Sequence, residues 1–475
     1  MTSMAKALEL PYELTSKIFI DCLPLRRRVR PRRRQAPLQI AQVCGHWRAV
    51  ALATPELWSS IYLEFSYGST SFDGIPTLFG EDNPDLIEDY TATLLELWFT
   101  RAAGHPLSIT LICSRGTFLD PKIFAVLAAH ANRWGRVELA ITEFDFLHFN
   151  QIVGPFPLLQ SLSLRIIDHS TSFPHRISAI EFSPNLRALQ LRDHLFRLLQ
   201  SPRTLAELPH TLTALQIEWS INEEPLLGKS TLEALVWLFE HFPQLRHFNC
   251  PVYHWPFQGS RLVQPLKSLV LSHNNIALHF FELPVLEHLQ VSLGGDTAPP
   301  HFIEFLVRSG SRLAHLGVDL EYMTSGGLSR TISALPVLPE LTTLELRLPV
   351  PSAENFQRPA GLARLRNLIV VDVCHEDRYT SFIALVRAWS PLVHAELRLW
   401  SKHVDVRRRM PPPGGHIVTE LAALNTQGLT ILVITPNWTW PSNARDLDPI
   451  EDLDHDVFIP PPPRASSFAP FGHTS

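Results

Sequence analysis

A short apolar pattern recurs through most of the chain and constrains its fold more than any other feature. In this pattern, h-x-x-h-x-h, h is an apolar residue and x is any residue. Successive copies begin 20 to 37 residues apart, and most intervals lie between 20 and 28 residues. A period of this size predicts stacked structural repeats with one short strand each. The copies begin at Leu159, Leu186, Leu212, Leu245, Leu266, Leu286, Leu313, Leu341, Leu368, Leu392 and Leu429, and a weaker copy begins at Trp134.

Segments with helical spacing precede several copies, at residues 120–134, 231–243, 301–311 and 380–391. A repeated helix and strand predicts a parallel sheet with helices outside it. We therefore expect an α/β solenoid of divergent leucine-rich repeats over residues 98–436. An α/β domain of unequal units is the alternative, because the pattern is common in leucine-rich chains. The asparagine of full repeats occurs only at Asn274, so we expect irregular turns and uneven curvature.

Alternation along the predicted strands assigns their polar residues to one surface of the sheet. In the copy "ELTTLEL" and the residues after it, Leu344, Leu346 and Leu348 should face the core. Glu345 and Arg347 should then face the opposite, concave side, which repeat proteins use for binding. The mixed charge of that side favours a protein target, because nucleic acid would require clustered Lys and Arg. The predicted target-binding residues are Gln190, Arg192, Gln216, Glu218, Gln290, Asp319, Glu345, Arg347, Asp372, Glu396 and Arg398.

Three short helical segments are predicted near the N-terminus. "LELPYELTSKIFIDCLP" carries apolar residues at helical spacing after a proline suited to a helix start. "VCGHWRAVALATP" continues the pattern and ends at Thr54, because the residue before a proline avoids the α region. "PELWSSIYLEF" begins the third segment. So small a unit buries little surface, so its apolar side chains should serve both a core and a partner. A plain helical subdomain with the aromatic residues inside is the alternative.

These segments resemble the F-box-like module of mushroom-type fungi. In that family the pattern LP-x-EL-x-x-x-IF-x-x-CLP is followed by a variable loop and by VC-x-x-W-x-x-x-A-x-x-TP-x-LW. The resemblance covers residues 8–62 and includes Leu10-Pro11, Cys22-Leu23-Pro24 and Leu57-Trp58. It implies docking on the Skp adaptor of a cullin–RING ubiquitin ligase. It also implies a divergent leucine-rich region after the module. The implied adaptor-binding residues are Leu10, Pro11, Leu14, Ile18, Val43, Cys44 and Trp47.

The loop between the first two segments is unusually basic, with seven arginines among residues 26–34. We expect a solvated loop. The alternative is a nuclear-import or phosphate-binding run.

The remaining segments and the composition limit the class of protein. Residues 63–97 are expected to form a connecting loop and linker helix, and residues 437–475 an acidic, proline-rich disordered tail. The net charge of −5 gives no nucleic-acid or membrane signature. No signal peptide or membrane span is predicted, so we expect a cytoplasmic or nuclear protein. The scattered cysteines, Cys22, Cys44, Cys113, Cys250 and Cys374, predict reduced, buried thiols.

Three functions were weighed against these features. The first is a non-enzymatic substrate receptor, in which the module binds the Skp adaptor and the repeats bind a protein target. The second is a repeat scaffold that works outside any ligase. The third is a hydrolase, although the chain contains no G-x-S-x-G, phosphate-loop or H-E-x-x-H motif. We expect no cofactor and no metal, and His46 in "CGHW" has no second ligand at metal spacing.

Overall fold

The computed structural model divides the chain into two compact units. Unit 1 comprises Met1–Trp219 with Trp237–Leu245, and unit 2 comprises Ser220–Val236 with Arg246–Ser475. The structure describes residues 10–24, 28–65, 84–114, 116–167, 177–192, 208–218, 238–251, 262–272, 276–293, 300–320, 335, 338–348, 361–373, 377–400, 413–435 and 439–441. Several sequence predictions lie outside these residues: those for Asn274, Cys374, Arg26, Arg27, residues 66–83, the tail from residue 442, and the side chains of Glu218, Cys250 and Leu348.

The N-terminal part of unit 1 is helical in the three predicted segments, except that residues 60–65 of the third segment form a strand. It contains α2 (Tyr12–Asp21), η1 (Ile40–Gln42), α3 (Gly45–Leu52) and η2 (Pro55–Trp58). The buried Trp58 indole donates its Nε1–H to the carbonyl of Ala51 at 2.9 Å. Its ring also packs edge-on against Trp98 at a centroid distance of 4.8 Å. Since Trp98 lies on α4 (Pro84–Arg101), these helices share a core with the segment that follows them.

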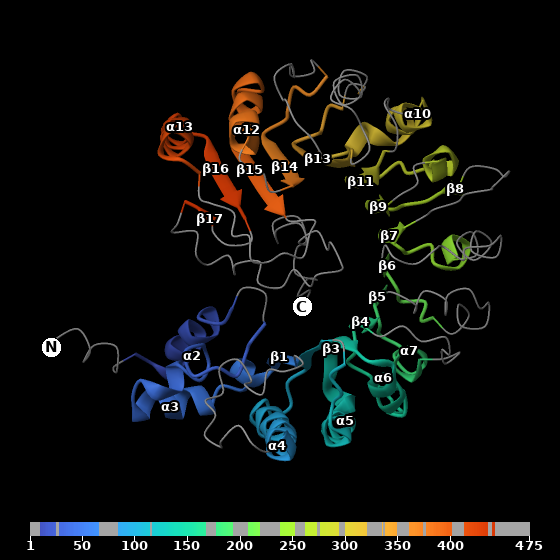
Figure 1. Cartoon of the computed structure of the whole chain (residues 1–475). Helices are drawn as coiled ribbons and strands as arrows, with labels where there is room; N and C mark the ends of the chain where they lie inside the picture. Colours follow the sequence, from blue (N-terminus) through green and yellow to red (C-terminus); the bar gives the residue numbers. More distant parts are fainter. Residues whose placement is uncertain are drawn as a thin grey trace. The chain divides into compact units, whose positions relative to one another are not determined.

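Unit 1 continues as a parallel sheet covered by helices on one side (Figure 1). Its strands follow chain order: β1 (Ser60–Phe65), β2 (Leu107–Cys113), β3 (Trp134–Ile141), β4 (Ser161–Ile166), β5 (Ala188–Arg192) and β6 (Ala214–Glu218). The connecting segments contain α5 (Pro121–Ala129), η3 (Ala131–Arg133), α6 (Glu143–Asn150) and α7 (Ser178–Glu181). The boundaries expected at residues 62 and 98 fall inside β1 and α4, so the sheet begins before the predicted repeat region.

Unit 2 has the same arrangement of parallel strands with outer helices (Figure 1). The parallel strands are β7 (His247–Pro251), β9 (Ser268–Ser272), β11 (His288–Ser292), β12 (His315–Asp319), β13 (Thr343–Leu348), β14 (Asn367–Val373), β15 (His394–Trp400) and β16 (Thr430–Ile434). β17 (Thr439–Trp440) pairs antiparallel with β16. The remaining elements are β8 (Leu262–Val263) paired with β10 (Phe281–Glu282), η5 (Ile276–Phe280), α10 (Pro300–Ser309), η6 (Gly310–Arg312), α12 (Asp377–Ala388) and α13 (Gly415–Thr426). The predicted α/β arrangement with a parallel sheet is confirmed.

Backbone hydrogen bonds form a regular ladder before the strands. The carbonyl of Lys267 accepts both the Glu287 and the His288 N–H, each at 2.9 Å. The carbonyl of Glu287 accepts two N–H groups from the next repeat in the same way, at Ala314 (2.9 Å) and His315 (3.0 Å). One carbonyl per repeat thus satisfies two backbone donors, which ties each repeat to the next.

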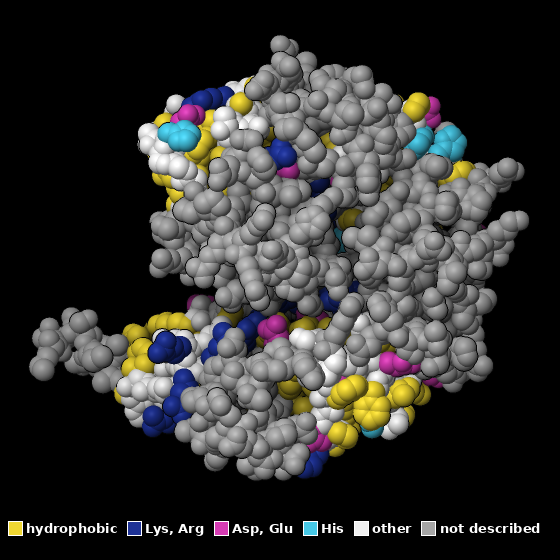
Figure 2. Space-filling model, in the orientation of Figure 1, with side chains coloured by type: hydrophobic (Ala, Val, Ile, Leu, Met, Phe, Trp, Pro, Cys, Tyr) yellow, Lys and Arg dark blue, Asp and Glu magenta, His cyan; other side chains and the backbone are white. Residues whose placement is uncertain are grey.

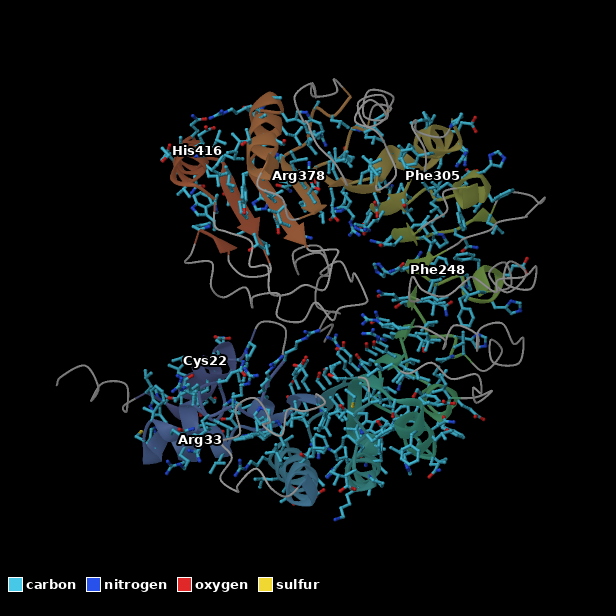
Figure 3. All side chains as sticks on the ribbon, viewed as in Figure 1. Cys22, Arg33, Phe248, Phe305, Arg378 and His416 are labelled. Atoms are coloured by element: carbon cyan, nitrogen blue, oxygen red, sulfur yellow. The ribbon has the colours of Figure 1, made fainter. Side chains whose placement is uncertain are left out.

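The pattern was assigned three residues too late in one repeat. Leu368 was taken as its first apolar residue, but the register pairs Leu368 with Leu344, a core position on β13. The buried triplet of this repeat is Leu365, Leu368 and Val370. Consequently Asp372 pairs with Leu348 and lies on the core side of β14, so its predicted place on the concave side of the sheet is wrong. Its carboxylate is buried and pairs with Arg378 of α12 at 3.1 Å (Figure 3 labels Arg378).

Candidate interaction surfaces

Besides Tyr12 and Leu52, four large apolar side chains of the N-terminal segment are exposed to solvent, and we call these four the apolar face. They are Leu10 (37% exposed), Leu14 (52%), Ile18 (47%) and Val43 (50%). On α2, the spacing of the residues causes this exposure. Phe19 and Thr15 point into the core, so the neighbouring Leu14 and Ile18 point into solvent. An exposed apolar surface that is kept on a folded scaffold is typical of a protein-binding site.

Contacts inside the module fix this face in place. The Phe19 ring packs on Trp47 of α3 at a centroid distance of 5.1 Å, which joins the two helices. The Tyr12 hydroxyl donates to the carbonyl of Ala53 at 2.5 Å. The Trp47 side chain is half-buried.

The other predicted adaptor-binding residues have structural roles as well. Pro11 is exposed, and its carbonyl accepts the N–H of Thr15 at 3.0 Å at the start of α2. The Cys44 sulfur accepts the Trp47 N–H at 3.4 Å and caps α3. Cys44 is half-buried and Cys22 is exposed (Figure 3), so the expectation of buried thiols is wrong for both.

The arginine run divides into two parts. Val29 is fully buried, and its carbonyl accepts the N–H of Tyr62 on β1 at 2.9 Å. Arg28 and Arg30 stack on the Tyr62 ring at 5.3 and 4.6 Å, and Arg30 pairs with Glu64 at 3.0 Å. Residues 28–30 therefore cover the outer strand of the unit 1 sheet, where a solvated loop was expected.

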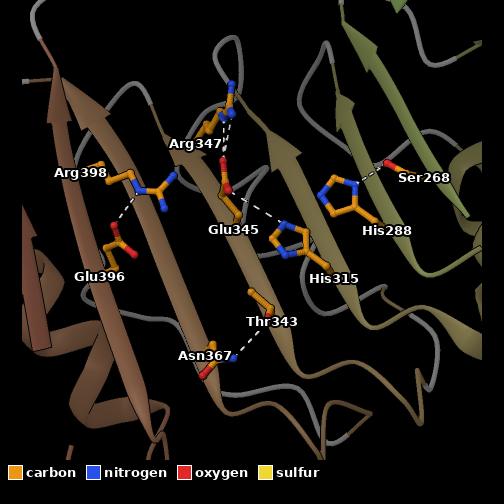
Figure 4. A network of polar contacts seen from close by, with 9 residues as sticks. All are labelled: Ser268, His288, His315, Thr343, Glu345, Arg347, Asn367, Glu396 and Arg398. Atoms are coloured by element: carbon orange, nitrogen blue, oxygen red, sulfur yellow. Dashed lines mark hydrogen bonds and ion pairs between the residues drawn. The ribbon is translucent and has the colours of Figure 1, made fainter. Parts of the chain in front are cut away.

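The non-core face of the unit 2 sheet carries a row of polar side chains at one register, which we call the histidine row (Figure 4). Ser268 and His288 are hydrogen-bonded, with 3.1 Å between Oγ and Nδ1. The rings of His288 and His315 lie 4.4 Å apart, and His315 Nε2 lies 4.0 Å from Glu345 Oε2. The row comprises His247, Ser268, His288, His315, Thr343, Asn367, His394 and Thr430.

Burial favours the neutral form of three histidines of this row, His247, His288 and His315. It lowers the pKa of His288 to about 3, with further lowering by His315 and His247. Burial also lowers the pKa of His247 and of His315. This row was not predicted from the sequence. Its signal is a histidine directly before the first core residue of a strand, as in "HFNC", "HLQV", "HLGV" and "HAEL".

Two carboxylate–guanidinium pairs lie beside the histidine row. Arg347 donates from Nε and Nη2 to Glu345 at 3.0 Å, and the Gln290 amide oxygen also accepts from Arg347. Arg398 donates from Nε to Glu396 at 2.9 Å. Burial raises the pKa of Glu345, but Arg347, Arg398 and His315 together lower it by more, so the net shift is downward.

The structure brings together part of the predicted target-binding set. Gln290, Glu345, Arg347, Glu396 and Arg398 belong to this one network, with Asp319 in register with Arg347. Glu345 and Glu396 are buried, at 6% and 3% exposure, where solvated side chains were expected. Their arginine partners stand two residues further along the same strands, which compensates their burial. The unit 1 residues Gln190, Arg192 and Gln216 lie on the non-core face of that unit, where Gln190 accepts from Ser163 at 2.9 Å.

The Ser268–His288 pair does not have the arrangement of a catalytic triad. A triad histidine is oriented by a carboxylate, whereas His288 stacks on the imidazole of His315. A pKa of about 3 also makes His288 a weak base at neutral pH. Within the described ranges, no group of three or more His, Cys, Asp or Glu side chains is placed to hold a metal ion.

Comparisons with known proteins found no matching protein-family model and no matching curated protein. Among the described helices, none has the length and apolar character needed to cross a bilayer.

Proposed function

We propose that this protein is a substrate receptor of a Skp–cullin–F-box type ubiquitin ligase. The N-terminal F-box-like module binds the Skp adaptor, and the leucine-rich repeats bind a protein target. The observation that carries the proposal is the apolar face, which the described chain leaves open although its supporting side chains are packed.

The energetics favour a partner on this face. About half of each of Leu14, Ile18 and Val43 remains in contact with water. Covering these halves contributes ~1 kcal/mol per side chain, which a partner gains and an isolated chain does not. The aromatic packing of Phe19 on Trp47 keeps the face rigid, so little conformational entropy is lost on binding.

The role of the repeats follows from the polar network on unit 2. Its paired charges and half-buried histidines offer directional hydrogen bonds, which select a protein surface by complementarity. Tethering a bound target to the ligase raises the effective concentration of its lysines near the ubiquitin-loaded enzyme. We propose that this transfer takes place in the cytoplasm or the nucleus.

The test is reconstitution from purified components. The full chain should retain the Skp adaptor on affinity resin, and the double variant L14D/V43D should not. The matched control is V307D, which places the same charge on another exposed apolar residue, on α10. Failure of the wild-type chain to retain the adaptor would refute the proposal. Adaptor binding with no partner accumulating in cells under proteasome inhibition would instead favour a scaffold outside the ligase.

A further inference from the structure

The second half of the arginine run has no role in the fold described above. Arg33 and Arg34 are exposed, unlike Arg28 and Arg30, which pack on Tyr62. Neither side chain makes an ion pair or hydrogen bond within the part of the chain that the structure describes.

These arginines lie beside the apolar face. The Gln42 amide donates to the carbonyl of Arg33 at 3.2 Å, which fixes the turn against η1, directly before Val43. Arg48 reaches the same element from α3, since its Nε donates to the carbonyl of Ala41 at 2.9 Å. Figure 2 shows Lys and Arg side chains next to hydrophobic ones over α2 and α3, and Figure 3 labels Arg33 there.

The resulting charge is positive in a chain that is negative overall. The exposed cations around the apolar face are Lys17, Arg33, Arg34 and Arg48, and the exposed carboxylates of α2 are Glu13 and Asp21. The excess of cations contrasts with the net charge of −5 for the whole chain. None of the four cations pairs with a carboxylate among the described residues.

We infer that Lys17, Arg33, Arg34 and Arg48 form a cationic rim that steers the apolar face onto a partner surface edged by carboxylates. The inference rests on the proposed function, because that partner is the Skp adaptor. Opposite charges around an interface raise the rate of association more than they slow dissociation. The rim therefore sets how fast the adaptor is captured, and the apolar face sets how long it stays.

Two other partners fit the same residues less well. Nucleic acid would neutralise the cations but leave Leu14, Ile18 and Val43 in water. A nuclear-import receptor would need the run as an accessible extended peptide. Residues 28–30 are instead held on β1 by the Val29 carbonyl and the Tyr62 ring.

The test measures association and dissociation rates of the full chain with purified Skp adaptor, between about 0.05 and about 0.5 M salt. For the wild-type chain we expect the association rate to fall about tenfold over this range. The variant R33E/R34E should associate about tenfold more slowly at low salt, with a dissociation rate within about twofold of wild type. The neutral variant R33Q/R34Q should fall between them.

The matched control is R136E/R187E, which makes the same charge change at exposed arginines of unit 1 outside the module. It should associate like the wild-type chain.

The cationic rim is overturned if association is insensitive to salt and to R33E/R34E while adaptor binding is still lost in L14D/V43D. That result leaves the proposed function standing. An equal slowing in R136E/R187E also overturns it, because net charge would then explain the effect. Absence of adaptor binding at every salt concentration refutes the proposed function and the rim with it. Loss of nuclear import in R33Q/R34Q with unchanged association rates assigns the arginines to an import receptor and overturns the rim.

Discussion

Acidification should destabilise unit 2 through His288. Its pKa is about 3 in the folded chain, against an ordinary value of 6.5. Above pH 6.5 the imidazole is neutral in both states, so it contributes no pH dependence. Between pH 6.5 and pH 3 the unfolded chain binds a proton that the folded chain does not. The free energy of unfolding therefore falls as the pH falls.

The size of this loss of stability follows because the unfolded chain binds one proton at each such histidine. Each pH unit below 6.5 costs about 1.4 kcal/mol, so His288 alone removes about 2 kcal/mol of stability between pH 7.5 and pH 5. His315 and His247 act in the same direction, because burial lowers the pKa of each. In the folded chain the charged groups that act on His288 and His315 are His247, Glu345, Arg347 and Arg398. The pKa of Glu345 is itself lowered, so its protonation at acid pH adds to the loss.

The measurement is urea unfolding of the full chain and of His288→Gln at pH 7.5 and pH 5. The variant should lose about 2 kcal/mol less than the wild-type chain between the two pH values. His416→Gln, at an exposed histidine of α13 (Figure 3), should behave like the wild-type chain. An equal loss in wild type and His288→Gln would refute this account of the histidine row.

Two further substitutions test the packing of each unit. Arg378→Met should lower the free energy of unfolding by about 3–5 kcal/mol, because it removes the guanidinium that pairs with the buried Asp372 carboxylate. The double variant D372N/R378M should recover much of that loss in the same urea titration, and no recovery would exclude the ion pair as the cause. Gly154→Ala should cost about 1–3 kcal/mol, since a Cβ there would lie 2.6 Å from the Phe156 ring. In the control Gly104→Ala, the new Cβ would have no atom within 4 Å, so its thermal unfolding should differ little from that of the wild type. Equal losses of stability in Gly154→Ala and Gly104→Ala would contradict the packing argument.

The strand ladder could be predicted because apolar spacing alone decides which side of a strand is buried. The same rule explains why β1 was not predicted and why β14 was predicted in the wrong register. In β1 the pattern is Trp58-x-x-Ile61-x-Leu63, with tryptophan in the position that leucine usually holds. In β14 a continuous apolar run fits the pattern twice, three residues apart, so periodicity cannot choose between the two registers.

The candidate surfaces were predictable to different degrees. The residues of the apolar face could be predicted from the family pattern. Their exposure could not, because it depends on which side of α2 Phe19 occupies. Glu345 and Glu396 look solvated in the sequence because charged residues are rarely buried alone. The E-x-R spacing in "LELRL" and "AELRL" was the available signal, since residues two apart on a strand share a face.

Hydrogen exchange of the full chain with and without purified Skp adaptor tests the central claim most directly. The account predicts slower exchange of backbone amides at α2 and across η1 and α3, residues 12–21 and 40–52, when the adaptor is added. Unchanged exchange in both segments, or protection confined to unit 2, would contradict it.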